Sequence, residues 1–204
     1  MEHFWSLLNA LDAETNFMMY EPNERKQHMD IQELETDIYH NVIHGNDFLQ
    51  IAKADNKIVG YLRAERGEFH RNFHTAYIVV GVLKEYQGKG IGTTFFENLE
   101  KWAKENSVIR LELTVECHNE AARKLYEKSD FKVEGIRAKS MLVKGEVVDE
   151  YYMAKIRANQ RIIAGNAQFA GIAAGRGVRF TTGLLLLGKG LGMRETPIRP
   201  HSWH

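Results

Sequence analysis

One stretch decides the fold of this chain: Tyr86-Gln87-Gly88-Lys89-Gly90-Ile91-Gly92. It lies between a β-rich segment, residues 75–83, and a strongly helical one, residues 93–106. A glycine turn that leads from a strand into a helix offers an anion the free N–H groups of the first helical turn. Glycine also removes the Cβ that would keep a ligand away from the backbone. The stretch therefore predicts a cradle for a phosphate or pyrophosphate group.

The spacing of the glycines narrows the class of ligand. It lacks both the G-x-G-x-x-G pattern of dinucleotide-binding folds and the G-x-x-x-x-G-K-[ST] pattern of P-loops. A second motif follows, Leu113-Thr114-Val115-Glu116-Cys117-His118-Asn119-Glu120-Ala121-Ala122-Arg123-Lys124-Leu125-Tyr126-Glu127-Lys128. The two motifs resemble Q/R-x-x-G-x-G/A and L-x-V-x-x-x-N-x-x-A-x-x-L-Y-x-K of the GCN5-related N-acetyltransferase (GNAT) family. The resemblance covers about residues 4–156.

Hydrophobic periodicity and turn residues predict the order ααβββαβαββ, an α/β (α+β) chain with a mostly antiparallel mixed sheet and helices on both faces. The order matches the acyl-CoA N-acyltransferase fold of the family, with its first edge strand missing. The predicted helices span residues 2–13, 24–44, 93–106 and 119–128, and the predicted strands span residues 48–54, 57–64, 75–83, 110–116, 131–143 and 147–156.

The resemblance implies acetyl-CoA as the donor substrate, without a metal. Its pantetheine would pair with the strand edge at Val80, Gly81 and Val82, because pantetheine is peptide-like and can extend a sheet. Gly81 stands where the family has a β-bulge. The donor residues implied by the two motifs are Val80, Gly81, Val82, Gln87, Gly88, Lys89, Gly90, Ile91, Gly92, Thr93 and Asn119.

The family mechanism is direct attack of a neutral amine on the thioester. Tyr126 would protonate the departing thiolate, and a phenol with a pKa near 10 is protonated at neutral pH. The backbone N–H of Val82 is the implied oxyanion donor. The base is less defined, because ribosomal-protein acetyltransferases of the family have a glutamate at the position of Thr114. Glu116 is the candidate base.

Glu112 and Glu65 are alternative bases: Glu112 shares one strand face with Thr114, and Glu65 lies on a preceding strand. A thiol nucleophile at Cys117 activated by His118 is disfavoured, because adjacent residues of a strand point to opposite sides. The histidines lack the spacing of a metal site. Asp130 stands where the family has a glycine in a left-handed turn, which costs a non-glycine residue about 1 kcal/mol.

Composition divides the chain near Ile156. Residues 157–204 hold seven of the 27 Lys and Arg residues, but only one of the 27 Asp and Glu residues, and eight of the 17 glycines. We expect residues 1–156 to be the acetyltransferase domain and residues 157–204 to be a disordered or non-native extension. Two alternatives are a strand at 178–187 that covers the open sheet edge, and an Arg/Gly segment that contacts nucleic acid.

The net charge is zero, which makes nucleic acid an improbable partner for the whole chain. No signal peptide or membrane-spanning run is recognisable, and a single cysteine fits a reducing compartment, so the cytoplasm is expected. A homodimer is compatible with the sequence. The predicted function is acetylation of a primary amine, with a small molecule favoured as acceptor. The alternatives are a protein N-terminus or lysine as acceptor, and a non-catalytic acyl-CoA-binding module.

Overall fold

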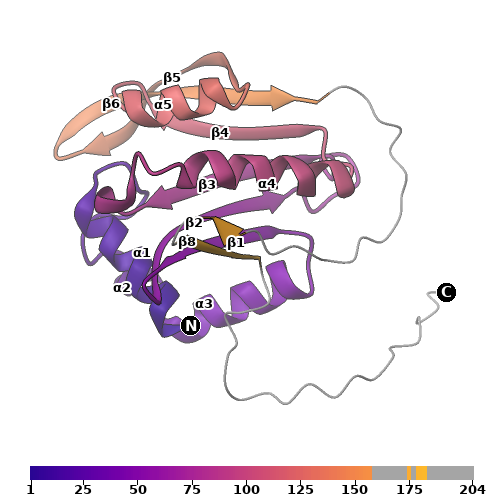
Figure 1. Ribbon diagram of the computed structural model, residues 1–204. Coiled ribbons are helices and arrows are strands. Elements are labelled where there is room, and N and C mark those ends of the chain that lie inside the picture. Colours follow the sequence, from indigo (N-terminus) through magenta and orange to yellow (C-terminus); the bar gives the residue numbers. More distant parts are fainter. Residues whose placement is uncertain (158–173, 176–177, 183–204) are drawn as a thin grey trace, which may run out of the picture.

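The computed structural model describes residues 1–157, 174–175 and 178–182 (Figure 1). The helices are α1 (Glu2–Glu14), α2 (Arg25–His28), α3 (Ile31–Asp37), α4 (Ile91–Glu105) and α5 (Glu120–Lys128), with a π-helix η1 (Ile38–Ile43) and a 3₁₀ turn η2 (Lys84–Tyr86). The strands are β1 (Phe48–Ala54), β2 (Lys57–Arg66), β3 (Thr75–Val82), β4 (Arg110–Glu116), β5 (Lys132–Val143), β6 (Glu146–Ile156), β7 (Ala174–Gly175) and β8 (Val178–Thr182).

These strands form one sheet in the order β5-β6-β4-β3-β2-β1-β8-β7. The contact between β3 and β4 is parallel, and the other strand pairs are antiparallel. Helix α1 covers one face, where the ring of Phe4 packs 5.4 Å from that of Tyr61 on β2. Helix α4 covers the other face, where Trp102 packs 5.3 Å from Phe48 on β1. The predicted fold class, with helices on both faces, is confirmed.

Two turns follow directly from the sequence. Asp55 and Asn56 have φ values of 45° and 63°, and they join β1 to β2 as the two-residue hairpin that Asp and Asn favour. Lys144 and Gly145 have φ values of 51° and 84°, and they join β5 to β6 in the same way. Asn119 caps α5, since its side-chain oxygen accepts a hydrogen bond from the N–H of Ala122 at 3.2 Å.

The single helix predicted over residues 24–44 is wrong. The chain is extended at Met29, and a new helix begins at Ile31 with Asp30 as its N-cap. The Asp30 carboxylate accepts hydrogen bonds from the N–H groups of Gln32 and Glu33, and the Glu33 carboxylate accepts one from Asp30 N. This capping box satisfies the free donors of a helix start, so α2 and α3 are separate helices. The Asp-x-x-Glu spacing was visible in the sequence.

Strand β8 pairs antiparallel with β1 from Gln50↔Thr182 to Ala54↔Val178. The sheet edge that lacks the family's first strand is therefore covered over these five residues, as the alternative of a strand at 178–187 predicted. The expectation of a disordered or non-native extension falls mainly on residues 158–173, 176–177 and 183–204, outside the described residues. Arg157 is part of the folded domain, because its guanidinium bonds Glu100 and the carbonyl of Val108.

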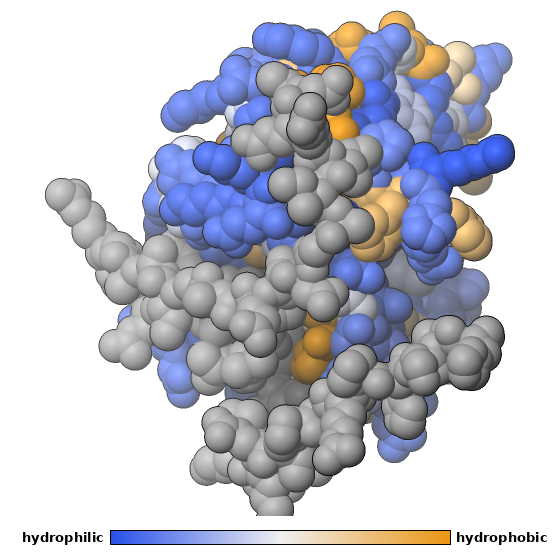
Figure 2. All heavy atoms as spheres, turned by 90° about the vertical axis from the view of Figure 1, so that its right-hand side faces the viewer, coloured by the Kyte–Doolittle hydropathy of each residue, from blue (hydrophilic) through white to orange (hydrophobic). Residues whose placement is uncertain are grey.

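The opposite edge of the sheet is exposed. Strand β5 is open to solvent along most of its length. Figure 2 shows hydrophobic residues at the top of the molecule, where Figure 1 places β5 and β6. The exposed apolar residues of this hairpin are Val133, Ile136, Leu142, Val147 and Ile156.

Asp130 has a φ of 69°, as the sequence predicted for the turn after α5. We expect Asp130→Gly to raise the free energy of unfolding by about 1 kcal/mol and the melting temperature by about 2–4 °C. The salt bridge that would be lost, to Lys155 at 3.7 Å, is exposed on the Asp130 side and contributes little. A thermal melt measures the change, and a lower melting temperature for the variant would contradict the interpretation.

Candidate active site

The site is built around a fork between β3 and β4. The two strands pair over three positions only, Thr75↔Arg110, Ala76↔Leu111 and Tyr77↔Glu112, although both strands continue beyond them. On its other side β3 pairs with β2 without a register shift as far as Val82. The second half of β3 therefore has a partner on one side and an unpaired edge on the other.

The hydrogen-bond pattern shows which backbone groups face the fork. Leu83 N donates to Val59 O at 2.9 Å, and Gly67 N donates to Thr75 O at 3.1 Å, so odd-numbered residues of β3 face β2. Alternate residues of an antiparallel strand bond the same neighbour, so Val80 and Val82 point their N–H and C=O groups at the fork. These are the groups that the sequence assigned to pantetheine and to the oxyanion.

Gly81 has a packing role. The register between β2 and β3 continues through Gly81↔Tyr61, so the expected bulge is absent from this strand pair. A Cβ at Gly81 would lie 2.7 Å from Cδ1 of Leu11 and 3.2 Å from the ring of Tyr61. The missing side chain lets α1 pack directly on β3 beside the fork, which is the packing explanation that competes with ligand contact.

The glycine loop lies at the open end of the fork. Gly88 and Gly90 have φ values of 69° and 83°, and a Cβ at either would meet no atom within 4 Å, so their backbone is accessible. The Gln87 side chain donates to Val82 O at 2.9 Å and ties the loop to β3. The first helical hydrogen bond of α4 is from Thr94 N to Gly90 O, which leaves the N–H groups of residues 91–93 for a ligand.

The remaining loop residues are fixed by packing or solvent. Ile91 is buried in the core, so only its backbone can serve a ligand. A Cβ at Gly92 would lie 2.7 Å from Cδ2 of Leu125, which makes Gly92 the contact point between α4 and α5. Lys89 is exposed, and its ammonium lies 4.8 Å from the ring centre of Tyr86. Thr93 is half-buried in the first turn of α4.

Tyr126 is buried against Phe96 and Phe131, whose ring centres lie 5.7 Å and 6.2 Å from its own. Burial raises the pKa of Tyr126 above its ordinary value, and the nearby Tyr77 and Tyr61 add to the rise. The phenol is thus protonated at neutral pH.

Helix α5, which holds Tyr126, begins directly after β4, and α4 begins directly after β3 and the glycine loop. The positive ends of both helices therefore meet the open end of the fork. Asn119 is the N-cap residue of α5, and its side-chain oxygen accepts a hydrogen bond from the N–H of Ala122. The structure thus gathers the predicted donor residues around one opening.

The three candidate bases differ in their surroundings. Glu116 is buried, and its Oε2 lies 3.2 Å from Nε2 of the exposed His118 in an ion pair that lacks hydrogen-bond geometry. Burial raises the pKa of Glu116, His118 lowers it and Glu150 raises it. Glu112 is bound by Arg110, which also holds Glu134.

Glu65 lies 3.4 Å from Arg63 and is about half exposed. Burial of the rest of its carboxyl raises the pKa of Glu65. The His118 ring packs 5.4 Å from that of Phe17 in the connection after α1, and it pairs with Glu116. Cys117 is half-buried, and its N–H bonds Asp149 O across to β6, so its backbone has a structural role.

The sequence did not indicate which residues lie at the apex of the fork, the closed end where β3 and β4 stop pairing. Tyr77 Oη lies 2.9 Å from Thr114 Oγ1, so two hydroxyls bridge β3 and β4 where the ladder ends. Tyr77 also lines a cavity of about 310 Å³ beside the apex, together with Glu65 and Glu112. The pairing could have been suspected only if the register of the parallel strands had been known.

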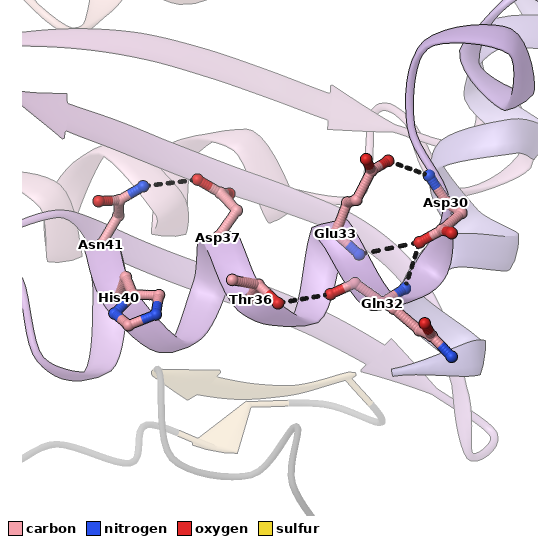
Figure 3. Close-up of a pocket in the computed structure, with 7 residues that line it drawn as sticks. All are labelled: Asp30, Gln32, Glu33, Thr36, Asp37, His40 and Asn41. Atoms are coloured by element: carbon pink, nitrogen blue, oxygen red, sulfur yellow. Dashed lines mark hydrogen bonds between the residues drawn. The ribbon is translucent and has the colours of Figure 1, made fainter.

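A larger cavity, about 450 Å³, lies along α3 and η1 (Figure 3). Its side chains mostly bond one another: Asp30 and Glu33 form the capping box, and Asn41 donates to Asp37. Asp37 in turn binds Arg63 of β2. Figure 1 shows α3 on the far side of β1 from the fork. Because these groups serve helix capping and helix–sheet attachment, we do not assign the catalytic site to this cavity.

Comparison with known proteins identifies the class. The model of the acetyltransferase (GNAT) family matches residues 10–131, and the chain belongs to this family. L-amino acid N-acetyltransferase AaaT of Escherichia coli (strain K12) is 32% identical over 111 residues, which is 52% of this chain and 67% of that protein. The chain is therefore an acetyl-CoA-dependent N-acetyltransferase by family.

Solved structures share the fold. A GNAT-family acetyltransferase from Streptococcus pneumoniae superposes with a TM-score of 0.70 at 24% identity, over 76% of this chain and 92% of that one. Ribosomal-protein-alanine N-acetyltransferase from Brucella melitensis gives 0.61 at 23% identity, over 76% and 93%. A Salmonella typhimurium protein described as an acetyltransferase, solved with acetyl-CoA, gives 0.64 at 16% identity, over 82% and 92%.

None of the helices in the described part of the chain has both the length and the apolar character that a membrane crossing requires. Within residues 1–157 and the two short C-terminal strands, no three His, Cys, Asp or Glu side chains are grouped as a metal site would need.

Glu116 gives the stability of the protein a defined pH dependence. Its pKa is higher in the folded protein than in the unfolded chain, so its favourable contribution is full below the ordinary glutamate pKa, about 4.3. That contribution is lost as the pH rises through the folded pKa. Glu116→Gln cannot ionise. We expect the difference in melting temperature, variant minus wild type, to become more positive between about pH 4 and pH 8.

The matched control is Glu35→Gln, because Glu35 is an exposed acid of α3. Thermal melts of the three proteins across the pH series measure the effect. A difference between Glu116→Gln and wild type that stays constant with pH would contradict the burial of an ionisable carboxyl.

Proposed function

We propose that this protein transfers the acetyl group of acetyl-CoA to the amino group of a small molecule, within a ternary complex. The observation that carries the proposal is the fork. Its unpaired edge at Val80 and Val82, the accessible glycine loop and the buried Tyr126 surround one opening. Each feature suits one part of acetyl-CoA. The strand edge can pair with pantetheine, the glycine loop can bind the pyrophosphate, and the Tyr126 phenol can protonate the thiolate that leaves.

The donor lies along the fork in this proposal. Pantetheine amides bond the C=O group of Val80 and the N–H of Val82, as an added strand would. The pyrophosphate binds at residues 88–93, where free N–H groups and the positive end of α4 favour negative charge. Asn119 contributes its side-chain amide at the start of α5. Gln87 and Gly92 act indirectly: the Gln87 side chain holds the loop on β3, and the missing side chain at Gly92 lets α5 pack against α4.

The chemistry is direct acyl transfer. The amine nitrogen forms a bond to the thioester carbon. The Val80 N–H, which lies nearer the closed end of the fork than the Val82 N–H that the resemblance implied, stabilises the negative oxygen of the tetrahedral intermediate. The carbon–sulfur bond then breaks, and Tyr126 gives its proton to the thiolate. The nitrogen loses one proton to Glu116 through water, and the exposed imidazole of His118, 3.2 Å from Glu116, passes it to solvent. Solvent returns a proton to Tyr126, so overall the amine loses one proton and the thiol of CoA gains one.

The α-amino group of an L-amino acid is the acceptor we test first. Support comes from the Escherichia coli relative, whose name states that activity. A protein N-terminus or lysine is the alternative acceptor, and the ribosomal-protein enzyme that shares the fold motivates its inclusion. Thr114 stands where those enzymes of the family have a glutamate, which favours the small molecule.

The experiment is release of CoA from acetyl-CoA with each of the twenty L-amino acids and with a peptide as acceptors. We expect turnover of at least one amino acid and a loss of kcat of about a hundredfold or more in Tyr126→Phe, the range for removal of a general acid. The buried ring is retained in this variant, so acetyl-CoA binding by calorimetry should be unchanged. Binding of acetyl-CoA without turnover of any acceptor would instead favour a non-catalytic acyl-CoA-binding module.

A further inference from the structure

The cavity of about 310 Å³ lies at the closed end of the fork. The end of β2, the connection that follows it and the first residues of β3 and β4 form its walls. Tyr77 and Glu112, the last pair of the β3–β4 ladder, are both among its lining residues. The cavity therefore begins where the donor-binding edge ends.

Three side chains of this cavity form one row across the sheet. Tyr77 on β3 is the register partner of Glu65 on β2 and of Glu112 on β4. Register partners project to the same face of a sheet, with neighbouring strands about 4.8 Å apart. The row thus presents an aromatic ring with a carboxylate on each side. Phe69, which is 71% exposed, adds an apolar wall.

The cationic partners of these acids are shared. Arg63 binds Asp37 and Asp47 and lies 3.4 Å from Glu65, so one guanidinium serves three carboxylates. Arg110 divides its charge between Glu112 and Glu134 in the same way.

Arg66 and Glu68 also line the cavity. The Arg66 guanidinium donates to the carbonyls of Phe73 and Asn106, and Glu68 is exposed. Carboxylates therefore exceed guanidiniums around this cavity, which favours a cationic ligand.

The hydroxyl bridge between Tyr77 and Thr114 joins this cavity to the fork. Val80, the first free donor of the open edge, is three residues beyond Tyr77, about 10 Å along the strand. A thioester bonded along that edge would end close to the bridge. An amino group beside the Tyr77 ring would then face the thioester carbon, as attack requires.

We propose that the cavity binds the acceptor as its ammonium ion, between the carboxylates of Glu65 and Glu112 and against the ring of Tyr77. The inference rests on the proposed function and names the residues that select its acceptor. Carboxylates attract the ammonium group directly, and an aromatic face attracts cations. Loss of one proton from the bound ammonium to solvent then gives the neutral amine that attacks the thioester. Glu65 and Tyr77 are specificity-determining residues in this scheme, distinct from Tyr126 and Glu116.

The test uses the full chain with L-leucine and L-leucinamide, two probes that share the amino group and differ at the carboxyl group. We expect Glu65→Gln to raise KM for both amines by about tenfold or more, since a hydrogen bond to a charged group is lost. Tyr77→Leu should do the same, whereas Tyr77→Phe, which keeps the ring, should change KM less than Tyr77→Leu. Calorimetry should give an unchanged Kd for acetyl-CoA in every variant.

The control is Glu35→Gln, which removes an exposed acid on α3 and should leave KM unchanged. A thermal melt of each variant confirms folding. If Glu65→Gln does not fold, the KM of Tyr77→Leu tests the inference. KM values within twofold of wild type in the folded variants would overturn the inference while leaving the proposed function intact. A wild-type protein that binds acetyl-CoA but acetylates no amine would contradict both.

Discussion

The β3–β4 ladder ends after three residue pairs, and the rest of the site depends on that interruption. Two adjacent parallel strands would ordinarily continue to pair, because an unpaired backbone N–H or C=O away from water costs free energy. Here β3 keeps its ladder with β2 and β4 keeps its ladder with β6, so each strand is fixed by its other neighbour. The fork can therefore stay open without loss of the sheet.

Packing on both faces fixes the geometry of the opening. Leu11 of α1 occupies the space above Gly81, and Leu125 of α5 contacts Gly92 at the start of α4. At the apex, the hydroxyls of Tyr77 and Thr114 bridge the strands where the backbone bonds end. Gly81 and Gly92 therefore lie on either side of the proposed donor site, and each leaves room for a side chain of a neighbouring helix. Local packing and donor binding make use of the same small residues.

Much of this architecture could be predicted from the sequence. The glycine loop, the Asp55-Asn56 turn and the Asn119 cap are local signals, and each lies where its side-chain chemistry predicted. The resemblance of two motifs to one family supplied the fold class and the donor. Helical periodicity alone does not show the break at Met29, which is marked only by the capping box of Asp30 and Glu33.

The apex could not be predicted in the same way. Tyr77 and Thr114 are 37 positions apart, and their contact depends on the register of two parallel strands joined by a long crossover. The same holds for the row of Glu65, Tyr77 and Glu112, which no spacing in the sequence brings together. The role of Gly81 also depended on tertiary structure, because only the position of α1 shows that Leu11 needs the space.

The most direct measurement is residue-resolved amide hydrogen exchange by NMR, with and without acetyl-CoA. If pantetheine pairs with the fork, we expect exchange at the Val80 and Val82 N–H groups to slow at least tenfold, as each gains a hydrogen bond. Val79 and Gly81, which already face β2, should not change. Unchanged exchange at Val80 and Val82 in protein saturated with acetyl-CoA would contradict the assignment of the fork as the donor site.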